Sequence, residues 1–249
     1  MPVKMIVTDL DGTLLRTDKT ISNYTATVFR RCTEKGIKIA FATARPLYLT
    51  NDYTKVIAID GLIATNGAFV YANNEIITER TLPLDISKPL LLELGASPEV
   101  QRIGARKRDV YYTTGPRYDT DIFCDFKVPV NEIFAHLSFR TESDVFASAI
   151  IRKYRELVIY HVSGENLYDI GAAGCTKGNG VKDLASFFKV QAAEIVAFGD
   201  DFNDVEMLRE YGIGVAVANA IDEAKAAADN ICDTNDNDGV AKWLEENVL

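Results

Sequence analysis

The stretch that decides the fold is Met5-Ile6-Val7-Thr8-Asp9-Leu10-Asp11-Gly12-Thr13-Leu14-Leu15. Its apolar beginning predicts a short buried β-strand, and two aspartates follow this strand one residue apart. Because side chains alternate along a strand, Asp9 and Asp11 can face the same reaction centre where the strand gives way to a loop. Two carboxylates held this close repel each other, and a hard divalent cation such as Mg2+ relieves that repulsion. The stretch therefore predicts a magnesium site at the end of the first strand.

Two other interpretations of this motif start from the same residues. Asp-Gly is an ordinary turn signal, so residues 9–13 can also form a plain surface turn. A calcium loop of the EF-hand type needs a helix before its first aspartate and a glutamate at its last position. Here a strand pattern precedes Asp9, and Thr20 stands where that glutamate is required. We therefore reject the calcium loop and keep the turn as the alternative.

The composition restricts the classes of function. The chain has 249 residues and a formal net charge of −9, which disfavours nucleic acid as a partner because phosphate backbones require a basic face. No apolar run reaches the roughly 18 residues of a membrane span, and the first residues show no signal-peptide pattern. We therefore expect a cytoplasmic protein with no membrane partner. Four widely spaced cysteines form no C-x-x-C pair, which favours free thiols over a zinc site or disulfides: Cys32, Cys124, Cys175 and Cys232.

Short apolar runs alternate with helical patterns in both end regions of the chain. After the first strand, runs at 37–42, 61–64, 195–198 and 214–217 predict strands, and 22–35, 47–56, 181–188 and 221–228 predict helices. This alternation favours right-handed crossovers and a parallel sheet, so we predict an α/β fold with a Rossmann-like, doubly wound core. Ligands of such sheets bind at the carboxyl ends of the strands, where Asp9, Asp11, Thr43 and Asn66 are expected.

The pattern changes between residues 83 and 171. A hairpin is expected around 69–77, and mixed elements follow, with helices at 89–94 and 143–154 and strands at 110–113, 133–139, 157–162 and 168–170. This segment interrupts the parallel-sheet domain. We therefore predict a core domain made of residues 1–82 and 172–249, and an inserted α/β cap domain of residues 83–171. The sequence does not indicate the oligomeric state.

Four groups of residues, in chain order, resemble the four motifs of the haloacid dehalogenase (HAD) superfamily of phosphatases: Asp9/Asp11, Thr43, Lys177 and Asp200/Asn203/Asp204. The stretch Gly199-Asp200-Asp201-Phe202-Asn203-Asp204 is similar to the G-D-x-x-N-D form of the Cof-like branch, subclass IIB. The insertion after the third strand also resembles that branch. The resemblance covers the whole chain apart from the details of the cap, and it implies a cap of type C2.

The resemblance also implies a role for each motif. Asp9 is expected to be the nucleophile that forms an aspartyl-phosphate, and Asp11 the general acid and base. Mg2+ is the implied cofactor, with Asp9, the backbone carbonyl of Asp11 and Asp200 as ligands, and Asp204 is expected to support the metal or orient Lys177. The groups expected to bind phosphate are the amides of Leu10 and Ala44 and the side chains of Thr43, Lys177 and Asn203.

Several residues in or near the motifs have two possible interpretations. Lys182 is a rival of Lys177, which we favour because the glycine after it lets the chain approach a ligand closely. Asp201 also fits a helix N-terminus that the helix dipole favours. Arg45 fits either substrate binding or a solvated surface, and Asn66 either a simple turn or the lining of the site.

The predicted cap contains few candidate functional residues. His136 and His161 both lie in strand-like runs, and we interpret them as structural. The one basic cluster fits either the recruitment of an anionic substrate or, by preference, a solvated face: Arg102, Arg106, Lys107 and Arg108.

The function that this resemblance implies is that of a magnesium-dependent phosphatase that hydrolyses a small phosphorylated metabolite, either a sugar phosphate or a phosphorylated cofactor. Phosphoryl transfer depends mainly on positioning and on charge neutralisation, and the motifs supply both. A phosphomutase or phosphotransferase on the same core is the first alternative, since the cap selects the acceptor. A non-catalytic binding protein is the second, and it is disfavoured because Asp9, Asp11, Lys177 and Asp200 are all present.

Overall fold

The computed structural model describes all residues except 1, 109, 114–126, 128, 138–142 and 162–165, and it omits the side chains of 111, 113, 136 and 143–146. The chain divides into two compact units, a core unit (Met1–Thr78 and Thr176–Leu249) and an inserted unit (Glu79–Cys175). The inserted unit begins at residue 79, against 83 in the sequence prediction, and ends at 175, against 171.

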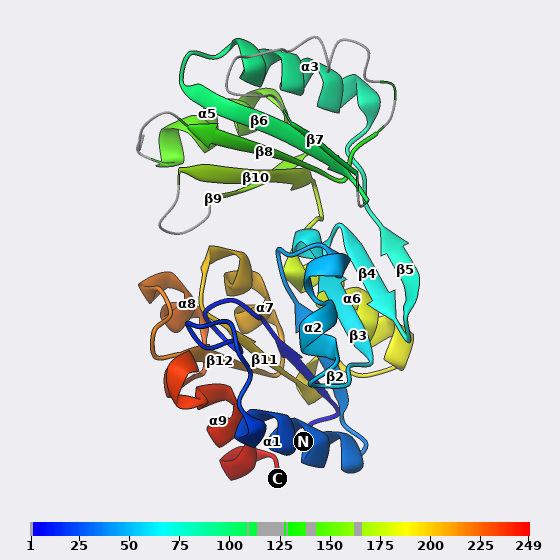
Figure 1. Ribbon diagram of the computed structural model, residues 1–249, viewed down its shortest axis with the longest axis vertical. Helices are drawn as coiled ribbons and strands as arrows, with labels where there is room; N and C mark the ends of the chain where they lie inside the picture. Colours follow the sequence, from blue (N-terminus) through cyan, green and yellow to red (C-terminus); the bar gives the residue numbers. More distant parts are fainter. Residues whose placement is uncertain (1, 109, 114–126, 128, 138–142, 162–165) are drawn as a thin grey trace. The chain divides into compact units, whose positions relative to one another are not determined.

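The core unit is built on an eight-stranded sheet with the order β13-β12-β11-β1-β2-β3-β4-β5 (Figure 1). The six strands from β13 to β3 run parallel, and β4 turns back antiparallel to β3. The strands are β1 (Met5–Thr8), β2 (Lys38–Ala42), β3 (Gly61–Ala64), β4 (Phe69–Ala72), β5 (Glu75–Glu79), β11 (Ile195–Gly199), β12 (Ile213–Val217) and β13 (Asn230–Cys232).

Helices cover both faces of this sheet. The helices are α1 (Asn23–Glu34), α2 (Asn51–Thr54), α6 (Lys177–Phe188), α7 (Val205–Glu210), α8 (Asp222–Ala227) and α9 (Gly239–Asn247). On one face, Val7 and Ala197 pack against Val181 of α6. Phe198, the next residue along β11, has its ring 5.5 Å from that of Trp243 in α9, which lies beside α1 (Figure 1). Because neighbouring strand residues point to opposite faces, the sheet is doubly wound, as predicted.

Two predicted features of the core unit were wrong. The expected helix at 47–56 is two short pieces, a 3-10 helix η1 (Leu47–Leu49) and α2. The Thr50 hydroxyl between them donates to the carbonyl of Leu47 (2.7 Å), and this local bond closes the first turn in place of continuous helix. Strand β13 was missed because its three residues carry no alternating pattern, and only its pairing with β12 makes it a strand.

The inserted unit has a five-stranded antiparallel sheet with the order β7-β6-β8-β10-β9. Helices α3 and α5 lie on one face of this sheet (Figure 1), and Leu90, Leu91 and Leu94 of α3 join a buried apolar cluster with Ile133 and Ile170. Its elements are α3 (Leu84–Ala96), β6 (Val100–Lys107), β7 (Val110–Thr113), β8 (Glu132–Leu137), α5 (Ser143–Lys153), β9 (Leu157–His161) and β10 (Leu167–Ala172).

Two predictions for this unit were also wrong. Helix α3 begins at Leu84 rather than at Pro89, because the burial of its leucines outweighs the backbone hydrogen bond that the proline lacks. Strand β6 was missed, since its residues were interpreted only as a basic cluster. The predicted ends of two strands, residues 138–139 and 162, lie outside the described residues.

The basic cluster of β6 is largely neutralised within the inserted unit. Arg106 pairs with Glu132 (3.2 Å), while Lys107 and Arg108 both pair with Glu79 (3.1 and 2.8 Å). These ion pairs argue against the recruitment of an anionic substrate. Arg106 and Lys107 are largely covered, with 14% and 28% of their side chains exposed, whereas Arg108 is solvated. The ring of His161 packs against the ring of Tyr168, 4.9 Å away, and the side chain of His136 lies outside the description.

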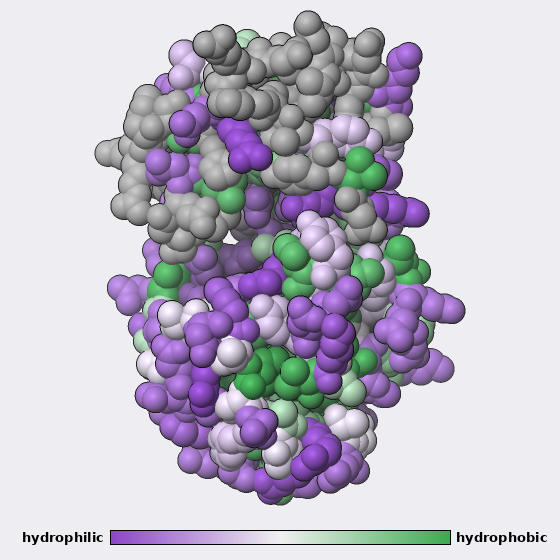
Figure 2. Space-filling model, in the orientation of Figure 1, coloured by the Kyte–Doolittle hydropathy of each residue, from purple (hydrophilic) through white to green (hydrophobic). Residues whose placement is uncertain are grey.

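The visible surface of the core unit is mostly hydrophilic, with hydrophobic residues gathered near α2 and β3 (Figure 2). A cavity of about 500 Å3 lies there, between Leu47, Asn51 and Leu62, and no predicted site residue lines it. Cys32, Cys175 and Cys232 are free and buried, whereas Cys124 lies outside the description. In the described part of the chain, no helix is long and apolar enough to cross a membrane.

Candidate active site

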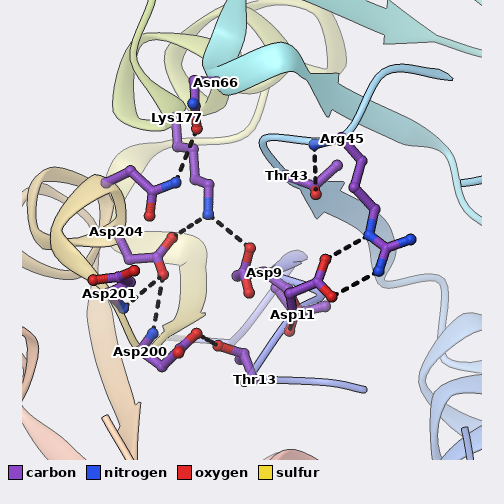
Figure 3. Close-up of polar contacts among 12 residues, drawn as sticks. Asp9, Asp11, Thr13, Thr43, Arg45, Asn66, Lys177, Asp200, Asp201 and Asp204 are labelled. Carbon is purple, nitrogen blue, oxygen red and sulfur yellow. Dashed lines mark hydrogen bonds and ion pairs between the residues drawn. The ribbon is translucent and has the colours of Figure 1, made fainter. Parts of the chain in front are cut away.

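The predicted site residues meet at one edge of the core sheet. Strands β11, β1, β2 and β3 are neighbours and run parallel, so their carboxyl ends lie side by side. Asp200, Asp9, Thr43 and Thr65 are the residues that directly follow these four strands. Lys177 begins helix α6, and its side chain reaches into the same group (Figure 3). Parallel pairing therefore collects side chains that are far apart in the sequence.

Lys177 lies at the centre of the buried part of the site. Its ammonium donates to Asp9 Oδ1 and to Asp204 Oδ1, each at 2.7 Å, and the residue is only 1% exposed. Thr176 caps its helix, accepting a hydrogen bond from the amide of Asn179 (3.0 Å). The other oxygen of Asp9, Oδ2, is buried and has no hydrogen-bond partner among the described residues.

The loop after β11 is held by Asp204. Asp204 Oδ2 accepts from the amides of Asp200 (2.9 Å) and Asp201 (3.2 Å), while Oδ1 binds Lys177. Both of its oxygens are therefore engaged within the protein. This arrangement orients Lys177 and fixes the backbone that carries Asp200.

Asp200 approaches the first motif closely. Its Oδ1 accepts from the Thr13 hydroxyl at 2.6 Å. Gly12 has φ +86°, and a Cβ placed there would lie 2.3 Å from Asp200 Oδ2, so the site requires glycine at this position. Thr13 was not among the predicted site residues. Its place directly after Asp11-Gly12 was the only sequence signal for it.

Negative charge exceeds positive charge in this cluster. Burial raises the pKa of Asp9 well above 3.8, and the nearby Asp204 and Asp200 raise it further, although Lys177 opposes them. Burial, with the charge of Asp204, raises the pKa of Asp200 to about 7. Burial lowers the pKa of Lys177, but the two adjacent carboxylates outweigh it and raise the pKa above its ordinary value. When all three carboxyls are ionised, three carboxylates and one ammonium leave an excess of two negative charges.

The residues present fit a divalent cation. Carboxylate oxygens of Asp9, Asp200 and Asp204 lie within 4.8 Å of one another. Hard oxygen ligands are those that Mg2+ prefers, and its double charge matches the excess in the cluster. The partnerless Oδ2 of Asp9 is a buried acceptor that a cation would satisfy. Asp204 is the least available of the three, because both its oxygens already accept hydrogen bonds.

The carboxylate of Asp11 lies apart from this cluster. Arg45 binds it through two nitrogens, one of them at 2.7 Å (Figure 3). Lys19 donates to Oδ1, also at 2.7 Å. Burial raises the pKa of Asp11, but the hydrogen bonds and charges of Arg45 and Lys19 outweigh it, so the pKa lies below its usual range. Arg45 is therefore a partner of Asp11 rather than a solvated surface residue.

Groups that can hold a phosphate surround Asp9. Thr43 is 1% exposed, and its hydroxyl accepts from the amide of Arg45 (3.1 Å). In the part of the chain that the structure describes, the amides of Leu10 and Ala44 donate to no protein acceptor. Asn203 donates to Asn66 Oδ1 (2.9 Å), a contact that the sequence did not indicate.

Comparisons with known proteins agree with this geometry. The sequence profile of the haloacid dehalogenase-like hydrolases matches residues 6–244. A 5-amino-6-(5-phospho-D-ribitylamino)uracil phosphatase of Bacillus subtilis is 32% identical, over 97% of this chain and 96% of its own. A phosphoglycolate phosphatase of Methanopyrus kandleri is 26% identical, over 97% and 96% respectively.

Solved structures give the same result. A HAD-superfamily phosphatase from Bacteroides thetaiotaomicron superimposes with a TM-score of 0.83 at 25% identity, over 98% of this chain and 95% of its own. A sugar phosphatase of HAD subclass IIB superimposes with a TM-score of 0.81 at 26% identity, over 98% of both chains. The predicted family and the predicted phosphatase class are confirmed, and the chain belongs to the haloacid dehalogenase-like hydrolases.

Proposed function

We propose that this phosphatase is magnesium-dependent and hydrolyses small phosphomonoesters through an aspartyl-phosphate on Asp9. One observation carries the proposal: Asp9 is a buried carboxylate whose Oδ1 is held by Lys177, while Oδ2 has no partner among the described residues. A carboxylate kept in one orientation next to a cation suits nucleophilic attack on phosphorus.

In the first step, a carboxylate oxygen of Asp9 bonds to phosphorus as the bond to the alcohol oxygen breaks. Lys177 neutralises the phosphoryl oxygens, and the unpaired amides of Leu10 and Ala44, with the side chains of Thr43 and Asn203, donate to them. In the second step, water attacks the aspartyl-phosphate, which releases phosphate and restores the Asp9 carboxylate.

Mg2+ would be held by Asp9, Asp200 and the backbone carbonyl of Asp11. When bound, it supplies positive charge that lets an anionic nucleophile meet an anionic phosphate. Asp204 holds Lys177 and the Asp200 loop in place for this task.

Asp11 is the proposed proton carrier. It gives a proton to the departing alcohol oxygen and later takes one from the attacking water. The ion pairs with Arg45 and Lys19 favour the ionised carboxylate, which is the form that a base requires. Before Asp11 can act as an acid, its carboxylate has to leave these two cations and gain a proton.

The proposed substrate is a small phosphomonoester, either a sugar phosphate or a phosphorylated cofactor. Two relatives are named as phosphatases of phosphoribitylaminouracil and of phosphoglycolate, and one structural neighbour as a sugar phosphatase. We propose that the inserted unit acts as the cap that selects among such substrates. We further propose that the protein is cytoplasmic and has no nucleic-acid or membrane partner.

Phosphate release from a panel of small phosphomonoesters tests the proposal, with Mg2+ and with EDTA. We expect release that requires Mg2+ and that falls at least about a thousandfold in Asp9→Asn. Asp52→Asn, an exposed aspartate paired with Lys55, is the matched control and should retain full activity. Activity in EDTA, or full activity of Asp9→Asn, would contradict the mechanism. Interconverted sugar phosphates without free phosphate would replace hydrolysis by phosphoryl transfer to a sugar.

A further inference from the structure

The loop after β3 has an unusual backbone. Thr65, Asn66 and Gly67 have φ values of +50°, +49° and +90°, so three consecutive residues lie in the left-handed region. Glycine and asparagine tolerate this region, but the β-branched Thr65 does not. All three residues are buried. Such strain persists only where the surrounding structure imposes it, and it marks functional positions.

This loop is fixed against two phosphate-binding segments. The amide of Asn66 donates to the carbonyl of Thr43 (3.1 Å). Gly67 packs against the residue before Lys177, where a Cβ would lie 2.2 Å from the carbonyl oxygen of Thr176. The backbone of the loop is therefore held on both sides, and it points the side chain of Asn66 in one direction.

The side chain of Asn66, labelled in Figure 3, contacts that of Asn203. Asn203 Nδ2 donates to Asn66 Oδ1 at 2.9 Å, and this is the one side-chain hydrogen bond of either residue within the described chain. Asn203 Oδ1 is buried and has no partner there. In this orientation the NH2 group of Asn203 keeps a second N–H that can donate to a phosphoryl oxygen. If the nitrogen and oxygen of both amides are exchanged, Asn66 donates to Asn203 Oδ1 and both N–H groups of Asn203 are available. Asn66 thus fixes the rotation of the Asn203 amide in either assignment.

We propose that Asn66 is a positioning residue that acts through Asn203. Its left-handed backbone places its amide where it holds the amide of Asn203 toward the phosphoryl group. This proposal deepens the proposed function and rests on it, since Asn203 is there a phosphate ligand. The Asn66-Gly67 pair is therefore part of the catalytic apparatus rather than a simple turn.

Asn66→Gly separates the side chain from the backbone, because glycine keeps the left-handed conformation while removing the amide. With p-nitrophenyl phosphate and Mg2+, we expect kcat to fall about three- to tenfold and KM to stay within about twofold, as for the loss of one neutral hydrogen bond that orients a ligand. In an Asn203→Ala background, Asn66→Gly should cause no further fall. Asn73→Gly is the matched control, since Asn73 has φ +51° in the exposed β4–β5 turn.

Nuclear magnetic resonance of the side-chain amides gives a readout that does not depend on activity. Loss of a cross-peak pair in Asn203→Ala identifies the NH2 group of Asn203. In Asn66→Gly this pair should move toward the shifts of a solvated amide, and in Asn73→Gly it should stay in place. An unmoved pair, or equal falls in kcat with and without Asn203, would overturn the proposal. A wild type that releases no phosphate would refute the proposed function, while the resonances would still decide the contact.

Discussion

Removal of the negative charge of Asp9 is expected to stabilise the metal-free protein. The oxygens of Asp9, Asp200 and Asp204 lie within 4.8 Å of one another. With an effective dielectric constant of about 20, each repulsion between Asp9 and another carboxylate costs about 3.5 kcal/mol or more, so two pairs cost about 7 kcal/mol. The attraction to Lys177 at 2.7 Å returns about 6 kcal/mol. The attraction to Lys177 therefore does not offset the repulsion, and nothing is left over to offset the cost of desolvating the Asp9 carboxylate. We expect Asp9→Asn to raise the free energy of unfolding by about 1–3 kcal/mol at pH 8 in EDTA.

A lower pH and added Mg2+ should each reduce the stability advantage of Asp9→Asn over the wild type. The folded pKa of Asp9 lies above its ordinary value of 3.8, so the folded wild type binds a proton more tightly than the unfolded chain does. The stability that this carboxyl contributes is present at low pH and is lost as pH rises toward the folded pKa. The advantage of Asp9→Asn should therefore shrink as pH falls from 8 toward 4. Mg2+ at 100 times its dissociation constant should add about 2.7 kcal/mol to the wild type and less to the variant.

Urea unfolding followed by tryptophan fluorescence is the suitable assay. The chain has one tryptophan, and the Trp243 ring lies 5.5 Å from that of Phe198 on β11, so the signal reports on the core unit. Asp52→Asn, at an exposed ion pair, should shift stability by less than about 0.5 kcal/mol. The charge argument is refuted if Asp9→Asn is no more stable than the wild type at pH 8 in EDTA, or if its advantage persists at low pH.

Three further predictions concern the same site. Because burial and Asp204 raise the pKa of Asp200 to about 7, and the pKa of Asp9 is also raised, the apparent Mg2+ affinity should fall at least about tenfold for each pH unit below 7, and calorimetry showing a flat profile would contradict this. Thr13→Val removes the 2.6 Å hydrogen bond to Asp200 and should weaken Mg2+ binding about three- to tenfold, whereas Thr13→Ser should retain it. Gly67→Ala should lower the free energy of unfolding by about 3 kcal/mol or more, against about 1 kcal/mol for Gly36→Ala (φ +79° in open space), and equal losses in urea unfolding would sink this comparison.

Local sequence was enough to predict the elements of the core sheet that hold the candidate site residues. The apolar run of β1 is buried in the sheet, and the motif residues stand directly after strands or at the start of a helix, so their order alone indicated a shared edge. The sequence pattern was insufficient for elements that become strands only by pairing with a neighbouring strand. Strand β6 looked only like a basic cluster until its register with β8 opposed Arg106 to Glu132. The break after η1 depends on one hydroxyl contact.

The side-chain contacts that the motif residues make could be identified only from the tertiary structure. Thr13 and Asp200 are 187 positions apart, Asn66 and Asn203 137, and Asp11 and Arg45 34. No periodicity relates such pairs, because a side chain's rotamer is selected by neighbours that the fold brings to it.

The sequence by itself determined the α/β class of the core, the strand ends that hold the candidate site residues, and the excess of carboxylates that favours a divalent cation. These follow from alternation along a strand, from the crossover rule and from charge, which are properties of short segments. Only the tertiary structure decided that Lys177 holds one oxygen of Asp9, that Arg45 and Lys19 hold Asp11, and that Asn66 holds Asn203. Those contacts depend on the positions of several strands and loops at once, and no single segment encodes them.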